Sequence, residues 1–211
     1  MCLLNLKSGG NNKVDRNNDI EEYLKEYRSE RLEQKRTYLT NNMCKIEPEF
    51  YKKHNLLISQ QLTRQKNDAA AKLNYIYLCH LKSSDYTESY RAILGFSNSM
   101  LYLDEKKSQS YWYPELIYKN IFEDMNTIEK IVRNKFVRLE KFELLTIKHK
   151  ILNDDWILFQ ECFKTLINQS ISIIFNSSLR LADEILLLLL CGDYMDNLSI
   201  VGHLNTEGRL E

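Results

Sequence analysis

Glycine and proline are scarce in this chain, with six Gly and two Pro among 211 residues. Proteins built from many strands and tight turns use these residues repeatedly at their turns. Their scarcity, together with the lack of apolar–polar alternation, favours helices joined by short connections. The sequence therefore predicts an all-α fold, an irregular array or bundle of about eight to nine helices built from antiparallel helical hairpins.

Signatures of cofactor and metal chemistry are also absent. The scattered glycines cannot form a phosphate-binding loop. The four histidines (His54, His80, His149 and His203) are far apart and form no HExxH pattern. His80 and His149 are interpreted as residues at helix C-termini, where an imidazolium suits the dipole. We therefore expect no cofactor, no metal and no catalytic residue.

Long apolar runs are missing as well. The longest, 185–191, is far shorter than the roughly 20 residues that cross a bilayer, and the start is too short and polar for a signal peptide. The five cysteines form an odd set without CxxC spacing, which is typical of a reduced protein. These features predict a soluble, cytoplasmic protein that does not bind membranes.

Charge is balanced overall but unevenly distributed. Lys and Arg total 29, as do Asp and Glu, yet residues 151–211 contain nine acidic and three basic residues. Such an acidic region disfavours nucleic acid and favours a basic partner. A charge-asymmetric helical face without a specific role remains the alternative.

Helical patterns cover most of the chain after a segment, 1–15, that is expected to be flexible. Residues 16–211 are expected to form a single all-helical domain. Three turns place Asp before an aromatic residue, at Asp85-Tyr86, Asp155-Trp156 and Asp193-Tyr194, and each follows an apolar run. Because Asp is a favoured N-cap, each turn predicts a helical hairpin.

The turns Asn153-Asp154-Asp155-Trp156 and Gly192-Asp193-Tyr194 resemble those of tetratricopeptide-type repeats. Their Asp155 and Asp193 lie 38 positions apart (193 − 155), against a repeat of about 34. The wider layout over 16–204 is similar to that of all-helical immunity proteins encoded beside bacterial polymorphic toxins. The resemblance implies a non-catalytic protein that binds and blocks a cognate toxin.

The leading hypothesis is therefore an immunity protein that neutralises a basic toxin domain through an acidic C-terminal surface. Asp154 and Asp196 are expected to be exposed, whereas Asp155 and Asp193 are interpreted as caps. Trp112 and Tyr113 belong to an aromatic cluster suited either to the core or to an interface. The predicted partner-binding residues are Asp154, Glu161, Asp183, Glu184, Asp196, Trp112 and Tyr113.

Two other classes of function stay open. A helical adaptor or sensor would bind a peptide or protein in an apolar groove, and its binding would resist salt better than steered acidic binding. An enzyme would assemble its site from residues remote in sequence, and a pocket with clustered carboxylates or histidines would favour it. The oligomeric state is not predicted.

Overall fold

The fold is mixed α/β, so the all-α prediction is wrong. The computed structural model describes residues 12–68, 71–182 and 187–204, with side chains from Arg16 onward. The helices are α1 (Asn12–Asn41), α2 (Met43–Asn67), α3 (Lys82–Tyr86), α4 (Glu115–Tyr118), α5 (Ile121–Lys135) and α6 (Lys141–Asn176), with a short 3₁₀ turn η1 (Leu101–Leu103). The strands are β1 (Tyr75–His80), β2 (Ala92–Ser97), β3 (Ser108–Trp112), β4 (Leu187–Asp193) and β5 (Leu198–Leu204).

The strands form one five-stranded sheet in the order β3-β2-β1-β4-β5. A meander supplies β1, β2 and β3, which pair antiparallel. The hairpin of β4 and β5 joins the meander by parallel pairing of β4 with β1, from Tyr75 opposite Leu188 to His80 opposite Asp193. The last residues of β1 and β4 therefore lie side by side.

Burial on both faces explains why the central strands resemble helices in sequence. In β1, Ile76 and Leu78 join the main core under the helices, whereas Tyr77 and Cys79 pack in a smaller cluster on the opposite face. A strand buried on both faces is apolar at every position, and a short run of this kind cannot be distinguished from a buried helix by periodicity. The sequence has a helical pattern up to about Lys82 and another from Leu179 to Leu190, and the ends of both are strands, β1 and β4, for this reason.

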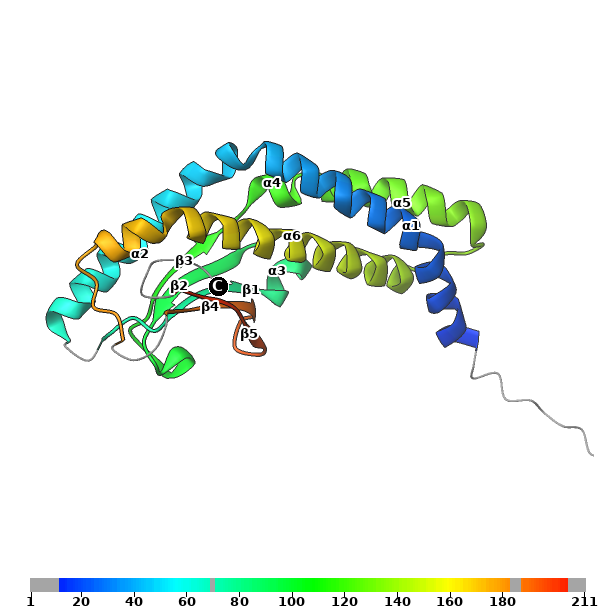
Figure 1. Ribbon diagram of the computed structural model, residues 1–211. Helices are drawn as coiled ribbons and strands as arrows, with labels where there is room; N and C mark the ends of the chain where they lie inside the picture. The colour runs from blue at the N-terminus through cyan, green and yellow to red at the C-terminus, as the bar shows by residue number, and fades with distance from the viewer. Residues whose placement is uncertain (1–11, 69–70, 183–186, 205–211) are drawn as a thin grey trace, which may run out of the picture.

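The long helices lie on one side of the sheet, and the short α3 lies at the end of the strands (Figure 1). α2 and the C-terminal half of α6 cover one face of the sheet, while α1, α5 and the N-terminal half of α6 extend beyond it as a helical arm. Aromatic side chains fill the covered interface: the Trp112 and Phe159 ring centroids are 4.8 Å apart, and Phe50 lies 5.6 Å from Trp112. No helix among the described residues is long and apolar enough to span a bilayer.

α6 runs without a break through the predicted turn at Asn153–Trp156, so that hairpin prediction is wrong. Asp154 and Asp155 do not cap a helix there. Asp154 accepts two hydrogen bonds from Arg28 of α1, at 2.9 and 2.7 Å. The fully buried Asp155 accepts from Arg31 at 2.9 Å and from Lys35 at 2.8 Å. These paired aspartates hold α1 against the middle of α6.

Other sequence predictions have mixed outcomes. Apolar residues recur at helical spacing from Asp19 to about Asn41 and from Trp156 to Ile174, which predicts helices there, and both stretches are helical, within α1 and α6. α1 begins at Asn12, inside the segment predicted to be flexible. The helix predicted from Asp193 is wrong, because Gly192–Asn197 turns the chain from β4 into β5.

Gly95 of β2 leaves room for the ring of Tyr77, its cross-strand partner in β1. A Cβ atom at position 95 would overlap that ring. We expect Gly95→Ala to lower the free energy of unfolding by about 1–3 kcal/mol through overpacking. Urea titration would measure it, and the same change in a Tyr77→Val background should cost less than half as much. Equal costs in both backgrounds would contradict the packing explanation.

Candidate active site

The site lies where the two parallel strands end. His80 is the last residue of β1 and Asp193 the last residue of β4, and the register pairs them. Parallel strands bring their carboxyl ends to one edge of a sheet, and ligands of open α/β sheets bind in the crevice outside that edge. α3 begins two residues after His80 and contributes Asp85 to the same place.

Three neighbours hold the His80 imidazole. Its Nε2 lies 3.0 Å from an Asp85 carboxylate oxygen, within hydrogen-bonding distance. Its Nδ1 lies 3.5 Å from an Asp193 carboxylate oxygen. The ring stacks on Trp156 of α6, with centroids 5.1 Å apart and planes inclined by 29°. The ring is therefore fixed in orientation between two carboxylates, while 14% of its side chain stays exposed.

Lys82 links the two segments that carry these groups. Its ammonium lies 2.8 Å from an Asp196 carboxylate oxygen and 3.0 Å from one of Asp193. Hydrogen bonds to Asp196 and Asp193 raise the pKa of Lys82, so the ammonium stays charged. The start of α3 is thereby tied to the turn between β4 and β5, at the mouth of the site.

A polar pocket of about 440 Å³ opens beside His80. Its walls come from the β1–α3 segment, from α6 and from the β4–β5 hairpin, and include a second imidazole, three side-chain amides and a hydroxyl. These groups are His149, Asn153 and Gln160 of α6 with Asn197 and Ser199 of the hairpin, and Tyr86 and Trp156 add aromatic surface. This volume suits a small molecule, and the lining offers it many hydrogen-bonding partners.

The chemistry of the pocket is that of proton transfer. A histidine whose ring is oriented by a carboxylate can take up a proton and return it during a reaction. The one thiol in the lining, Cys191, is a poor nucleophile, because burial raises its pKa to about 12. Among the described residues no group of three His, Cys, Asp or Glu could hold a metal ion.

The described acidic residues of the predicted partner-binding surface are either buried or paired with basic residues of the same chain. Asp154 is buried against Arg28, which overturns its expected exposure. Glu161 pairs with Arg36 and Asp196 with Lys82, although both acids stay exposed. Each of these acids is thus paired with a basic residue of the same chain. The basic residue offsets the negative charge that would attract a basic partner. Binding of such a partner stays a prediction.

The remaining predicted partner-binding residues are dispersed. Trp112 is fully buried beneath α2 and α6, so it belongs to the core. Tyr113 directly follows β3 and is 38% exposed. Asp183 and Glu184 lie outside the described residues. Of this set, the described residues are therefore one core residue, Trp112, and one partly exposed residue, Tyr113.

The histidines and aspartates that form the pocket are ones for which the sequence predicts only structural roles, at the ends of helices. His80 ends a strand and His149 lies within α6, so neither sits at a helix C-terminus as predicted. Asp85 and Asp193 were interpreted as helix caps, yet both face His80. Each of the two apolar runs ends on an ionisable residue, His80 after Cys79 and Asp193 after Gly192. An ionisable residue at the carboxyl end of a strand indicates a site only if the run is recognised as a strand.

No family model matches this chain, and neither the curated proteins nor the solved structures include a significant match to it.

Proposed function

We propose that this protein is an enzyme that uses His80 as an acid–base group on a small polar substrate. One observation carries the proposal: the imidazole is held between Asp85 and Asp193 on the wall of an open pocket. A pocket of clustered carboxylates and histidines is the feature that favours an enzyme over a non-catalytic binding protein. A titratable group in a cleft whose orientation is fixed by hydrogen-bonding neighbours is a common feature of catalytic sites.

Each neighbour has a definite part in this proposal. Asp85 accepts the Nε2 hydrogen bond and orients the ring, as a carboxylate does for a catalytic histidine. Trp156 fixes the plane of the ring. Lys82 holds Asp193 beside Nδ1. Because Nε2 donates to Asp85, Nδ1 is the nitrogen that exchanges the proton. It takes a proton from the substrate, or from a water that attacks the substrate, and returns that proton to the product, without a covalent intermediate.

His80→Gln should lower turnover by about 100-fold, the lower range for loss of general acid–base catalysis. Glutamine keeps a hydrogen-bonding group at this position but cannot exchange a proton near neutral pH. The test is incubation of the purified protein with a small-molecule extract of its host, followed by mass spectrometry. Compounds consumed by the unchanged protein should persist with the variant.

His203→Gln is the matched control, because it makes the same substitution at a histidine of β5 that does not line the pocket. It should retain most of the turnover. Equal conversion by the unchanged and His80→Gln proteins, or no conversion by either, would contradict the proposed function.

A further inference from the structure

An apolar groove lies beside the His80 pocket, in the helical arm. It has a volume of about 430 Å³ and is formed by α5, α6 and the segment that follows α3. Phe122 is 72% exposed and Leu145 is 45% exposed at its edges. Large apolar side chains gathered around a hollow mark binding surfaces. The apolar lining, called the α5–α6 groove below, consists of Tyr90, Ile121, Phe122, Met125, Leu144 and Leu145.

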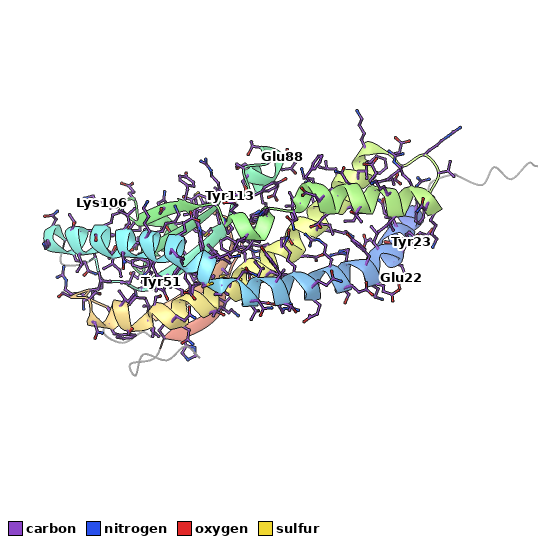
Figure 2. All side chains as sticks on the ribbon, turned by 90° about the horizontal axis from the view of Figure 1, so that it is seen from above. Glu22, Tyr23, Tyr51, Glu88, Lys106 and Tyr113 are labelled. Carbon is purple, nitrogen blue, oxygen red and sulfur yellow. The ribbon has the colours of Figure 1, made fainter. Side chains whose placement is uncertain are left out.

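The groove and the His80 pocket share a border. Tyr86 lines the pocket and Glu88 the groove, while on α6 His149 lines the pocket and Lys148 the groove. On the pocket side Tyr86 packs edge-on against His149 at 5.4 Å, and on the groove side Glu88 pairs with Lys148 at 2.6 Å, so both contacts join the segment around α3 to α6. Figure 2 shows Glu88 beside the start of α5. Tyr86 is 70% exposed, so it offers an open apolar surface between the two hollows.

The charges define the polar end of a ligand. Two carboxylates, of Asp85 and Asp193, line the His80 pocket together with the ammonium of Lys82, which Asp196 pairs from outside the lining at 2.8 Å. Carboxylates only accept hydrogen bonds at neutral pH. The pocket therefore suits a head group that donates hydrogen bonds or carries positive charge, and it repels an anionic one.

We infer that the substrate is an amphiphile: its hydrogen-bond-donating head enters the His80 pocket, and its hydrocarbon chain crosses Tyr86 into the α5–α6 groove. This inference rests on the proposed function, since it names the substrate class of the same site. The observation that carries it is that a polar pocket and an apolar groove lie next to each other, with neighbouring residues of the same two segments, Tyr86 and Glu88 on one and His149 and Lys148 on the other, in their linings. Each methylene that reaches the groove should raise affinity about fourfold, the value for burial of one CH₂ group.

Calorimetric titration with two probe series tests the inference. Alkylammonium ions from butyl to decyl supply a donating head, and the corresponding alkyl sulfates supply an anionic one. The unchanged protein should bind the longer alkylammonium ions about fourfold more tightly per methylene. It should bind each at least about tenfold more tightly than the sulfate of equal length, a difference that Asp193→Asn should reduce.

Two leucine variants separate the groove from general surface effects. Leu145→Asp should abolish the gain with chain length. Leu56→Asp, which changes an equally exposed leucine of α2 outside the groove, should leave it intact. Affinity that is independent of chain length, or unchanged by Leu145→Asp, overturns the inference. The groove would then be a candidate binding surface for a helix of a partner protein. Equal affinity for both head groups overturns it as well.

The two proposals can fail separately. Conversion of extract compounds that is unaffected by His80→Gln would remove the acid–base role, whereas the chain-length result does not depend on turnover. Loss of the chain-length dependence with retained His80-dependent turnover would remove the amphiphile and keep the enzyme.

Discussion

Asp155→Ala is expected to lower the free energy of unfolding by about 3–5 kcal/mol, the usual cost of removing one partner from a buried ion pair. Asp155 is fully buried and accepts hydrogen bonds from Arg31 and Lys35, whose side chains are only 7% and 11% exposed. Alanine would leave both cations between α1 and α6 without this carboxylate. Burial lowers the pKa of Lys35, and the carboxylate of Asp155 opposes that shift.

Glu161→Ala is the matched control for Asp155→Ala. Glu161 also lies on α6 and pairs with a cation of α1, Arg36, but both side chains are substantially exposed. Exposed pairs contribute about 0–1 kcal/mol, so the control should unfold at nearly the original urea concentration. Equal losses in the two variants would show that burial does not set the strength of these pairs. Chemical unfolding followed by circular dichroism measures both.

A second large effect is expected from acid, through His54 of α2. Its side chain is fully buried, and both ring nitrogens lack a hydrogen-bond partner. Burial between aromatic rings lowers its pKa to about 4, from an ordinary value of 6.5. The folded protein thus keeps this imidazole neutral at pH values where the unfolded chain binds a proton.

The sign of the effect follows from linkage. Between pH 6.5 and about 4 the unfolded state binds one proton more than the folded state, so stability falls as the pH falls. The difference of about 2.5 pH units corresponds to about 3 kcal/mol. His54→Leu should remove this loss, because leucine cannot bind a proton.

The measurement is the free energy of unfolding at pH 7 and near pH 4 for both proteins. Carboxylates titrate in both, so the difference between the two profiles isolates His54. The unchanged protein should lose about 3 kcal/mol more than the variant over this range. Parallel pH profiles would contradict the expected charge state of the buried imidazole.

The amphipathic helices could be predicted from the sequence, whereas the sheet could not. α1 and the second half of α6 have apolar residues at helical spacing, which is a strong local signal. β1 and β4 lack a periodic pattern of apolar residues, because the side chains on both of their faces are buried, each face by a different part of the chain. Asp155 resembled a cap because its partners, Arg31 and Lys35, lie more than a hundred positions earlier.

The candidate site was missed for the same reason. His80 and Asp193 become neighbours only through the pairing of β1 with β4, which a single sequence does not reveal. Trp156 and Lys82 can be identified in the sequence, but the sequence does not show that Trp156 stacks on His80 or that Lys82 pairs with Asp193. The Asp-Tyr-Met-Asp-Asn run after Gly192 was one usable signal, since clustered Asp, Asn and Gly between apolar runs also mark a hairpin turn.

β1 and β4 pair in the sheet although they are about a hundred residues apart in the chain, and this separation matters while the protein is being synthesised. β1 pairs with β2 soon after it leaves the ribosome, but its other edge waits for β4, which pairs Leu188 with Tyr75. At about 5–20 residues per second, that edge stays open for roughly 5–20 s. An unpaired apolar strand edge attracts other chains, so nascent chains are most vulnerable to aggregation in this interval. Asp193 cannot reach His80 until β4 has been synthesised, so the proposed site is incomplete throughout this interval.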